Sequence, residues 1–150
     1  MTNLEKIRDF FSILHDGTIE SCVGDNNKLT LKIGCQYLSE RIEPSFDFFF
    51  IDLFDINKLA LIPWMNPIDL EQEYFTKPKD IFQAKLDILS ADVDEDFVKV
   101  ACNQSDPSFS YCGGTLQLSC KDIKVFDEKK RELDFLDNIC KEYWDEFSNR

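Results

Sequence analysis

The chain has 150 residues, the size of one ordinary domain, and we expect a single α+β domain over residues 1–150. Hydrophobic residues make up 43% of it, and 29 acidic against 17 basic residues give a formal net charge of -12. Disorder requires low hydrophobicity as well as high charge, and a membrane-spanning helix requires about 20 consecutive apolar residues, so both classes are excluded. No secretory signal pattern opens the chain, and we therefore expect a soluble, cytoplasmic protein.

The first predicted element is a helix that begins at a capping box. Thr2 and Glu5 have the spacing at which each side chain satisfies a free backbone N–H of the other residue. Apolar residues then recur every three or four positions up to Leu14, which is the period of a helix with one buried face. Gly17 follows at the position where a left-handed residue commonly ends a helix.

Alternating patterns predict strands through the middle of the chain. Residues 19–23 and 29–35 form a hairpin around the turn-rich cluster 24–27. Residues 46–56 are apolar on both faces, which predicts a central strand covered on both sides, and 58–62 predicts a further short strand. The stretch 63–80 contains three prolines and reads as a long loop with room for one helical turn.

Further strands are predicted around residues 82–88, 97–102 and 113–120. The alternation of apolar residues slips at Lys121-Asp122, and a β-bulge there would return both sets of residues to the core. A C-terminal helix is predicted from Leu133 to Phe147. Short connections favour antiparallel pairing, so we expect a curved antiparallel β-sheet or open barrel of six to eight strands with N- and C-terminal helices.

The six cysteines are interpreted as reduced core thiols. They lack a Cys-x-x-Cys pair, and the single histidine, His15, cannot complete a two-Cys, two-His zinc site. The domain is also large enough to fold without disulfides. The six positions are Cys22, Cys35, Cys102, Cys112, Cys120 and Cys140.

No catalytic, cofactor or metal site is predicted. His15 beside Asp16 could serve as a base, but the favoured interpretation is a polar residue in the last turn of the helix. The acidic turn 92–96 resembles the start of a calcium loop, yet Phe97 and Asn103 stand where an EF-hand requires Gly and Glu. We interpret it as a solvated hairpin turn.

The negative charge is concentrated between residues 40 and 106, a stretch that contains 15 acidic and 6 basic residues. A negative surface repels nucleic acids and anionic membranes and attracts a basic protein. Aromatic residues stand among these acids, as at many protein interfaces, although the acids could equally serve only solubility. The predicted partner-binding residues are Trp64, Asp69, Glu71, Glu73, Tyr74, Phe75, Asp92, Asp94, Glu95 and Asp96.

The run from Phe11 to Ile19, with His15-Asp16-Gly17 at its centre, resembles a group of small bacterial domains. In that group a His-Asp-Gly turn follows the first helix and an antiparallel sheet follows the turn. Its members include uncharacterised proteins and immunity proteins of polymorphic toxin systems. The resemblance implies a cytoplasmic, non-enzymatic protein that neutralises a partner by occluding its surface, and it carries over no catalytic residue.

Together these observations predict an acidic protein-binding domain that occludes a basic partner and is itself a monomer or weak homodimer. The alternative is a small-ligand-binding domain or enzyme that uses a pocket in the curved sheet. A structural subunit that self-associates through the edges of its sheet is a third interpretation.

Overall fold

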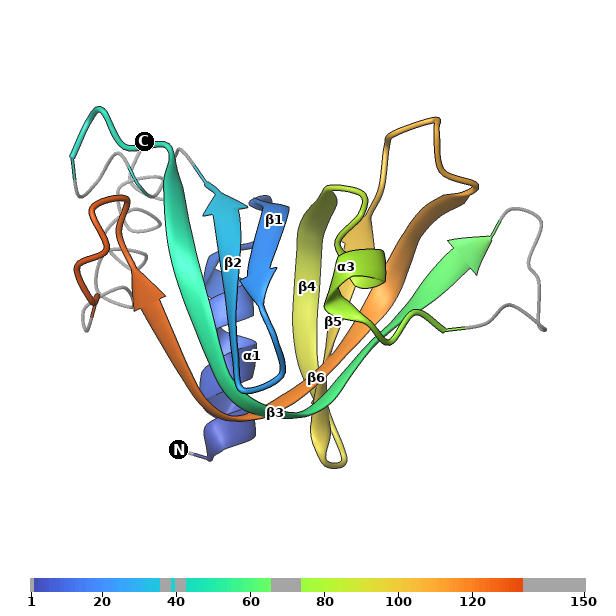
Figure 1. Ribbon diagram of the computed structural model, residues 1–150, viewed down its shortest axis with the longest axis horizontal. Helices are drawn as coiled ribbons and strands as arrows, with labels where there is room; N and C mark the ends of the chain where they lie inside the picture. The colour runs from blue at the N-terminus through green and yellow to red at the C-terminus, as the bar shows by residue number, and fades with distance from the viewer. Residues whose placement is uncertain (1, 36–38, 40–42, 66–73, 134–150) are drawn as a thin grey trace, which may run out of the picture.

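Six antiparallel strands form a closed ring in the computed structural model, which describes residues 2–35, 39, 43–65 and 74–133 (Figure 1). The strand order around the ring is β1-β2-β3-β6-β5-β4. The bounds are β1 Thr18–Gly24, β2 Lys28–Gly34, β3 Phe48–Met65, β4 Leu86–Asp94, β5 Phe97–Asn103 and β6 Tyr111–Phe126. The fold is therefore dominated by an antiparallel sheet, as the alternating patterns predicted, and its described helices are few and short.

A short seam closes the ring, so the expected open barrel is corrected to a closed one. Strands β1 and β4 pair only through Thr18 with Asp87 and Ile19 with Leu86. Two further backbone hydrogen bonds extend this seam: Asp16 N–H donates to Ile88 O at 2.8 Å, and Ile88 N–H donates to Gly17 O at 2.8 Å. The His-Asp-Gly turn thus belongs to the seam.

Helix α1, Asn3–Ile13, begins at the predicted capping box and buries Ile7 and Phe11 against β4, β5 and β6. Its end differs from the expectation, because Asp16 and not Gly17 is the left-handed residue, with φ 67°. Gly17 is needed for space: a Cβ there would lie 2.8 Å from the carbonyl oxygen of Leu14.

The hairpin β1–β2 is confirmed, whereas the two strands predicted at 46–56 and 58–62 are one 18-residue strand, β3. Asp55 has φ 49°, and the register with β6 shifts between Ile56 and Lys58. Figure 1 shows β3 and β6 bending together at this point, so that each strand runs through both halves of the molecule. A left-handed residue and an extra residue let the chain turn without leaving the sheet.

The prediction that 46–56 is covered on both sides is only partly right. Phe49, Ile51 and Leu53 point inward and are fully buried, but Phe48 and Phe50 on the other face are half-buried. The inward residues of β3 join those of the other strands and α1 in one core.

The second half of the chain follows the prediction with shifted bounds. The long loop does contain a single helical turn, α3, Pro78–Ile81, and β4 begins four residues later than the pattern at 82–88 suggested. In β6 the buried residues change from even to odd numbers across Lys121-Asp122, as predicted. The bulge that was expected there on β6 lies instead on β3, where the register shifts between Ile56 and Lys58. The predicted C-terminal helix from Leu133 to Phe147 lies outside the described residues except for buried Leu133.

Candidate functional site

The predicted acidic turn is the connection between β4 and β5. Asp92, Glu95 and Asp96 are exposed, and Asp94 pairs with Lys99 at 3.3 Å. Glu95 has φ 54°, which is typical of a tight hairpin turn. Two apolar side chains of β4 are also open to solvent, Leu89 at 42% and Val93 at 38%. This hairpin therefore presents carboxylates next to the exposed side chain of Val93, whereas Leu89 lies toward the other end of β4, opposite Ala101 and Cys102.

The predicted aromatic residues lie around the end of β3 and mostly serve packing. The indole N–H of Trp64 donates to the Thr115 hydroxyl at 3.1 Å. Phe75 makes two backbone hydrogen bonds with Leu61, and its ring packs 5.5 Å from that of Tyr111. Of these three predicted aromatics, only Tyr74 is strongly exposed, at 55%. Asp69, Glu71 and Glu73 lie outside the described residues.

The fold does not bring these two groups together. The acidic turn precedes Phe97 at one end of β5, whereas Asn103 at the other end pairs with Gly113, close to Trp64. At 3.3 Å per residue the two ends of β5 are about 20 Å apart. In Figure 1 the β4–β5 turn lies at the lower edge and the end of β3 lies at the right. A partner that touches both must cover this whole distance.

His15 lies in the turn after α1, as its favoured interpretation expected. Its Nδ1 is 2.8 Å from the carbonyl oxygen of Ser12, and its Nε2 is 3.9 Å from the Asp16 carboxylate. These contacts hold the imidazole of His15 against the turn that leads into the β1–β4 seam.

The cysteines divide by burial. Cys35, Cys102 and Cys120 are buried as predicted, and burial raises the pKa of Cys102 to about 12 and that of Cys120 to about 11. Cys22 is half-buried, and burial raises its pKa as well. Cys112 is exposed, which corrects its assignment to the core. Cys140 lies outside the described residues.

A further surface, which we call the Lys–Phe face, was not predicted from the sequence. It is the outer face of β2, the first half of β3 and the last half of β6, together with the turn after β6. Lysine ammonium groups stand over phenylalanine rings there: Lys32 is 4.3 Å from the Phe48 centroid and Lys130 is 5.2 Å from that of Phe50. The residues of the Lys–Phe face are Lys28, Thr30, Lys32, Phe48, Phe50, Asp52, Phe54, Lys124, Phe126 and Lys130.

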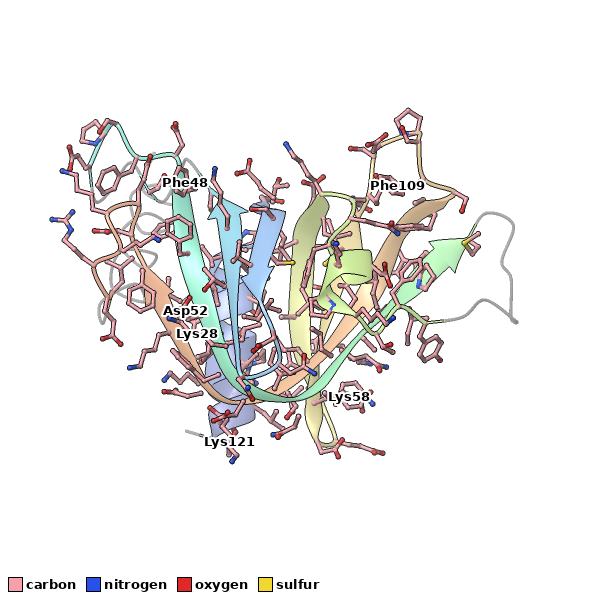
Figure 2. The ribbon with its side chains drawn as sticks, viewed as in Figure 1. Lys28, Phe48, Asp52, Lys58, Phe109 and Lys121 are labelled. Atoms are coloured by element: carbon pink, nitrogen blue, oxygen red, sulfur yellow. The ribbon has the colours of Figure 1, made fainter. Side chains whose placement is uncertain are left out.

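A cavity of about 250 Å³ opens on this face. Its lining consists of Lys28, Thr30, Phe50, Asp52, Phe126 and Lys130. Asp52 is 8% exposed, and its Oδ1 accepts a hydrogen bond from the Thr30 hydroxyl at 2.6 Å. Its Oδ2 lies 3.7 Å from the Lys28 ammonium group. Figure 2 shows Lys28 and Asp52 side by side, with Phe48 further along β3.

A second, shallower hollow of about 490 Å³ lies between the β1–β2 turn and α3. Its walls are residues 24–27 and Lys77, Pro78 and Lys79. It is wide open to solvent and holds no buried polar side chain, so it offers a ligand little enclosure.

Within the described part of the chain, no group of three or more His, Cys, Asp or Glu side chains has an arrangement that could hold a metal ion. None of the described helices combines the length and the apolar character needed to cross a membrane. No protein-family model, curated protein or solved structure matches this chain.

Proposed function

We propose that this protein is a binding domain that engages a basic partner protein through its acidic surface and occludes that partner, as an immunity-type inhibitor does. It acts in the cytoplasm by covering its partner and not by catalysis. The observation that supports the proposal is the β4–β5 hairpin, where exposed carboxylates stand beside the exposed side chain of Val93.

The charges of the hairpin are available to a partner. Among the described residues, Asp92, Glu95 and Asp96 form no ion pair, and only Asp94 is neutralised by a neighbouring lysine. Exposed carboxylates of one sign speed the encounter with a basic protein. The core of an interface is more apolar than its rim, and Val93 next to the turn and Leu89 further along β4 can supply apolar contacts.

The distance between the hairpin and the end of β3 suits a protein partner better than a small molecule. A standard interface buries about 800 Å² on each partner, which corresponds to a patch roughly 30 Å across. Such a patch spans the separation of about 20 Å along β5. A patch of this size is long enough to reach from the hairpin to the end of β3 near Trp64.

The test is capture of the partner with a charge-reversed hairpin and a matched control. The hairpin variant carries Asp92→Lys, Glu95→Lys and Asp96→Lys. The control carries Asp47→Lys, Asp80→Lys and Glu132→Lys, three exposed carboxylates that bond to no described side chain. Both variants change the net charge by the same amount, so a difference between them reports position and not overall charge.

We expect the unmodified protein and the control, immobilised and incubated with lysate of the source organism, to retain one basic protein in stoichiometric amount. High salt should release it, because the contact is electrostatic. The hairpin variant should retain none of it. Equal retention by the hairpin variant would show that the hairpin is not the binding surface. No basic protein on the unmodified protein would contradict the proposed function itself.

A further inference from the structure

The cavity on the Lys–Phe face combines three kinds of chemistry in one small volume. Phe50 and Phe126 are direct partners across the β3–β6 ladder, so their side chains lie next to each other on the same face. Lys28 and Lys130 line the cavity together with these rings. Thr30 and Asp52 supply the polar groups between them.

The lysines make the cavity locally positive on an acidic molecule. Asp52 is the single carboxylate of its lining, and Lys28 already compensates it at 3.7 Å. Among the described residues, Lys130 forms no ion pair, and neither does the neighbouring Lys124. An anionic group at this place would therefore find an ammonium group that is not already paired. Charges elsewhere on the surface act weakly here, because screening reduces them beyond about 8 Å.

The two neighbouring rings provide apolar surface against which a planar group can pack. Phe50 and Phe126 are half-buried, so each is fixed by the sheet and still has part of its ring accessible. Aromatic side chains on a sheet can stack with nucleobases, and the binding free energy from this stacking depends little on which base is bound. The Asp52 carboxylate has about four acceptor positions, of which one is used by Thr30. It can accept an N–H of a base that lies on the rings.

The size of the cavity limits the ligand. Cavities that bind small molecules usually measure about 300–1,000 Å³, and about 250 Å³ lies just below that range. A single nucleotide can occupy a cavity of this volume with part of the ligand in solvent. A longer polyanion would extend beyond the cavity and be repelled by a protein of net charge -12.

We propose that this cavity binds a nucleoside monophosphate. Its base stacks on Phe50 and Phe126 and donates an N–H to Asp52, and its phosphate binds the ammonium groups of Lys28 and Lys130. The site is separate from the β4–β5 hairpin, so the two proposals can fail independently.

The test is calorimetric titration of the full-length protein with AMP, GMP, CMP and UMP. Each nucleotide is compared with its nucleoside and with ribose 5-phosphate, which separate the contribution of the ring from that of the phosphate. We expect at least one nucleotide to bind about tenfold more tightly than both of its fragments, because charge-assisted hydrogen bonds and stacking each contribute. Backbone amide signals of Thr30 and Phe126 should shift in an NMR titration.

Two lysine variants locate the site. Lys130→Gln removes an exposed charge of the cavity and should weaken binding about tenfold. Lys58→Gln is the matched control, because the Lys58 ammonium group also stands over a ring, that of Phe97 at 4.6 Å, but beyond the bend of β3 (Figure 2). It should bind like the unmodified protein. Absence of binding by all four nucleotides, or equal affinities of the two variants, would overturn the proposal.

Discussion

At the residue scale, the five described thiols differ in reactivity because the fold gives them different environments. Cys112 is exposed near the start of β6, whereas Cys102 and Cys120 are buried in the sheet. The thiolate is the reacting form, and burial both hides a thiol and raises its pKa. We predict that iodoacetamide at pH 8 modifies Cys112 first and Cys102 and Cys120 last, as read from peptide masses over time. In Cys112→Ser none of the other four described thiols should react at this fast rate; a fast reaction at Cys102 or Cys120 would contradict the assignment.

The same buried thiols predict a loss of stability at alkaline pH. Their pKa values in the folded state, about 12 for Cys102 and about 11 for Cys120, lie above the ordinary value of 9.0. Between these values the unfolded chain releases protons that the folded chain retains, so the free energy of unfolding decreases as pH rises above about 9. Urea unfolding from pH 8 to 11 measures this slope. It should be smaller in Cys120→Ala, and an unchanged slope would exclude the thiol as a cause.

At the element scale, β3 has two faces whose side chains differ in their contribution to stability. Phe49 is fully buried, and its neighbour Phe48 lies half-buried under Lys32 on the other face. Phe49→Ala should lower the free energy of unfolding by about 3–5 kcal/mol because it opens a cavity in the core. Phe48→Ala should lower the free energy of unfolding by about 1–2 kcal/mol, since only part of the Phe48 side chain is buried in the folded protein. Urea unfolding of both variants tests the order, which would reverse if the register were shifted by one residue.

Local sequence patterns predicted the elements that depend on neighbouring residues. The capping box of α1, the β1–β2 hairpin and the acidic turn between β4 and β5 follow from side chains a few positions apart. The continuity of β3 could not be predicted in this way, because Asp55 and Asn57 are typical turn residues. Pairing with β6, more than 60 residues later, keeps the chain in the sheet through them.

The candidate sites show the same limit. The acidic turn was found because four of its five residues are carboxylates, but the sequence alone could not give its distance from Trp64, which lies near the other end of β5. The Lys–Phe face was missed because its residues come from three strands and a turn. No single strand contains the whole set, and only the ladder register places Phe50 beside Phe126.

At the scale of the whole molecule, stability depends on the seam that closes the ring. At Gly17 an added Cβ would lie 2.8 Å from Leu14 O and 3.2 Å from Gly34 O, both backbone atoms that cannot move aside alone. Gly17→Ala should therefore cost about 2 kcal/mol and open the seam. Hydrogen exchange should become faster at the amides of Asp16 and Ile88, which donate across it.

Gly34→Ala is the control for this prediction. The three atoms nearest to its added Cβ all belong to the Glu20 carboxylate group, the first at 3.1 Å, and that flexible side chain can turn away. The Gly34→Ala control should have nearly the same stability as the unmodified protein. Its amides at the seam should exchange as slowly as they do in the unmodified protein. Equal losses in the two variants would mean that the seam has no special part in closing the ring.

The shared bend of β3 and β6 also has a consequence for synthesis on the ribosome. Strand β3 emerges with four phenylalanines among its first seven residues, and its long edge has no partner until β6 has been translated. Phe54 pairs with Asp122, 68 residues later, and at about 5–20 residues per second that length takes several seconds to produce. During that interval the nascent chain carries an apolar strand with an unpaired edge, so a holding chaperone should increase the yield of folded protein most when translation is slow.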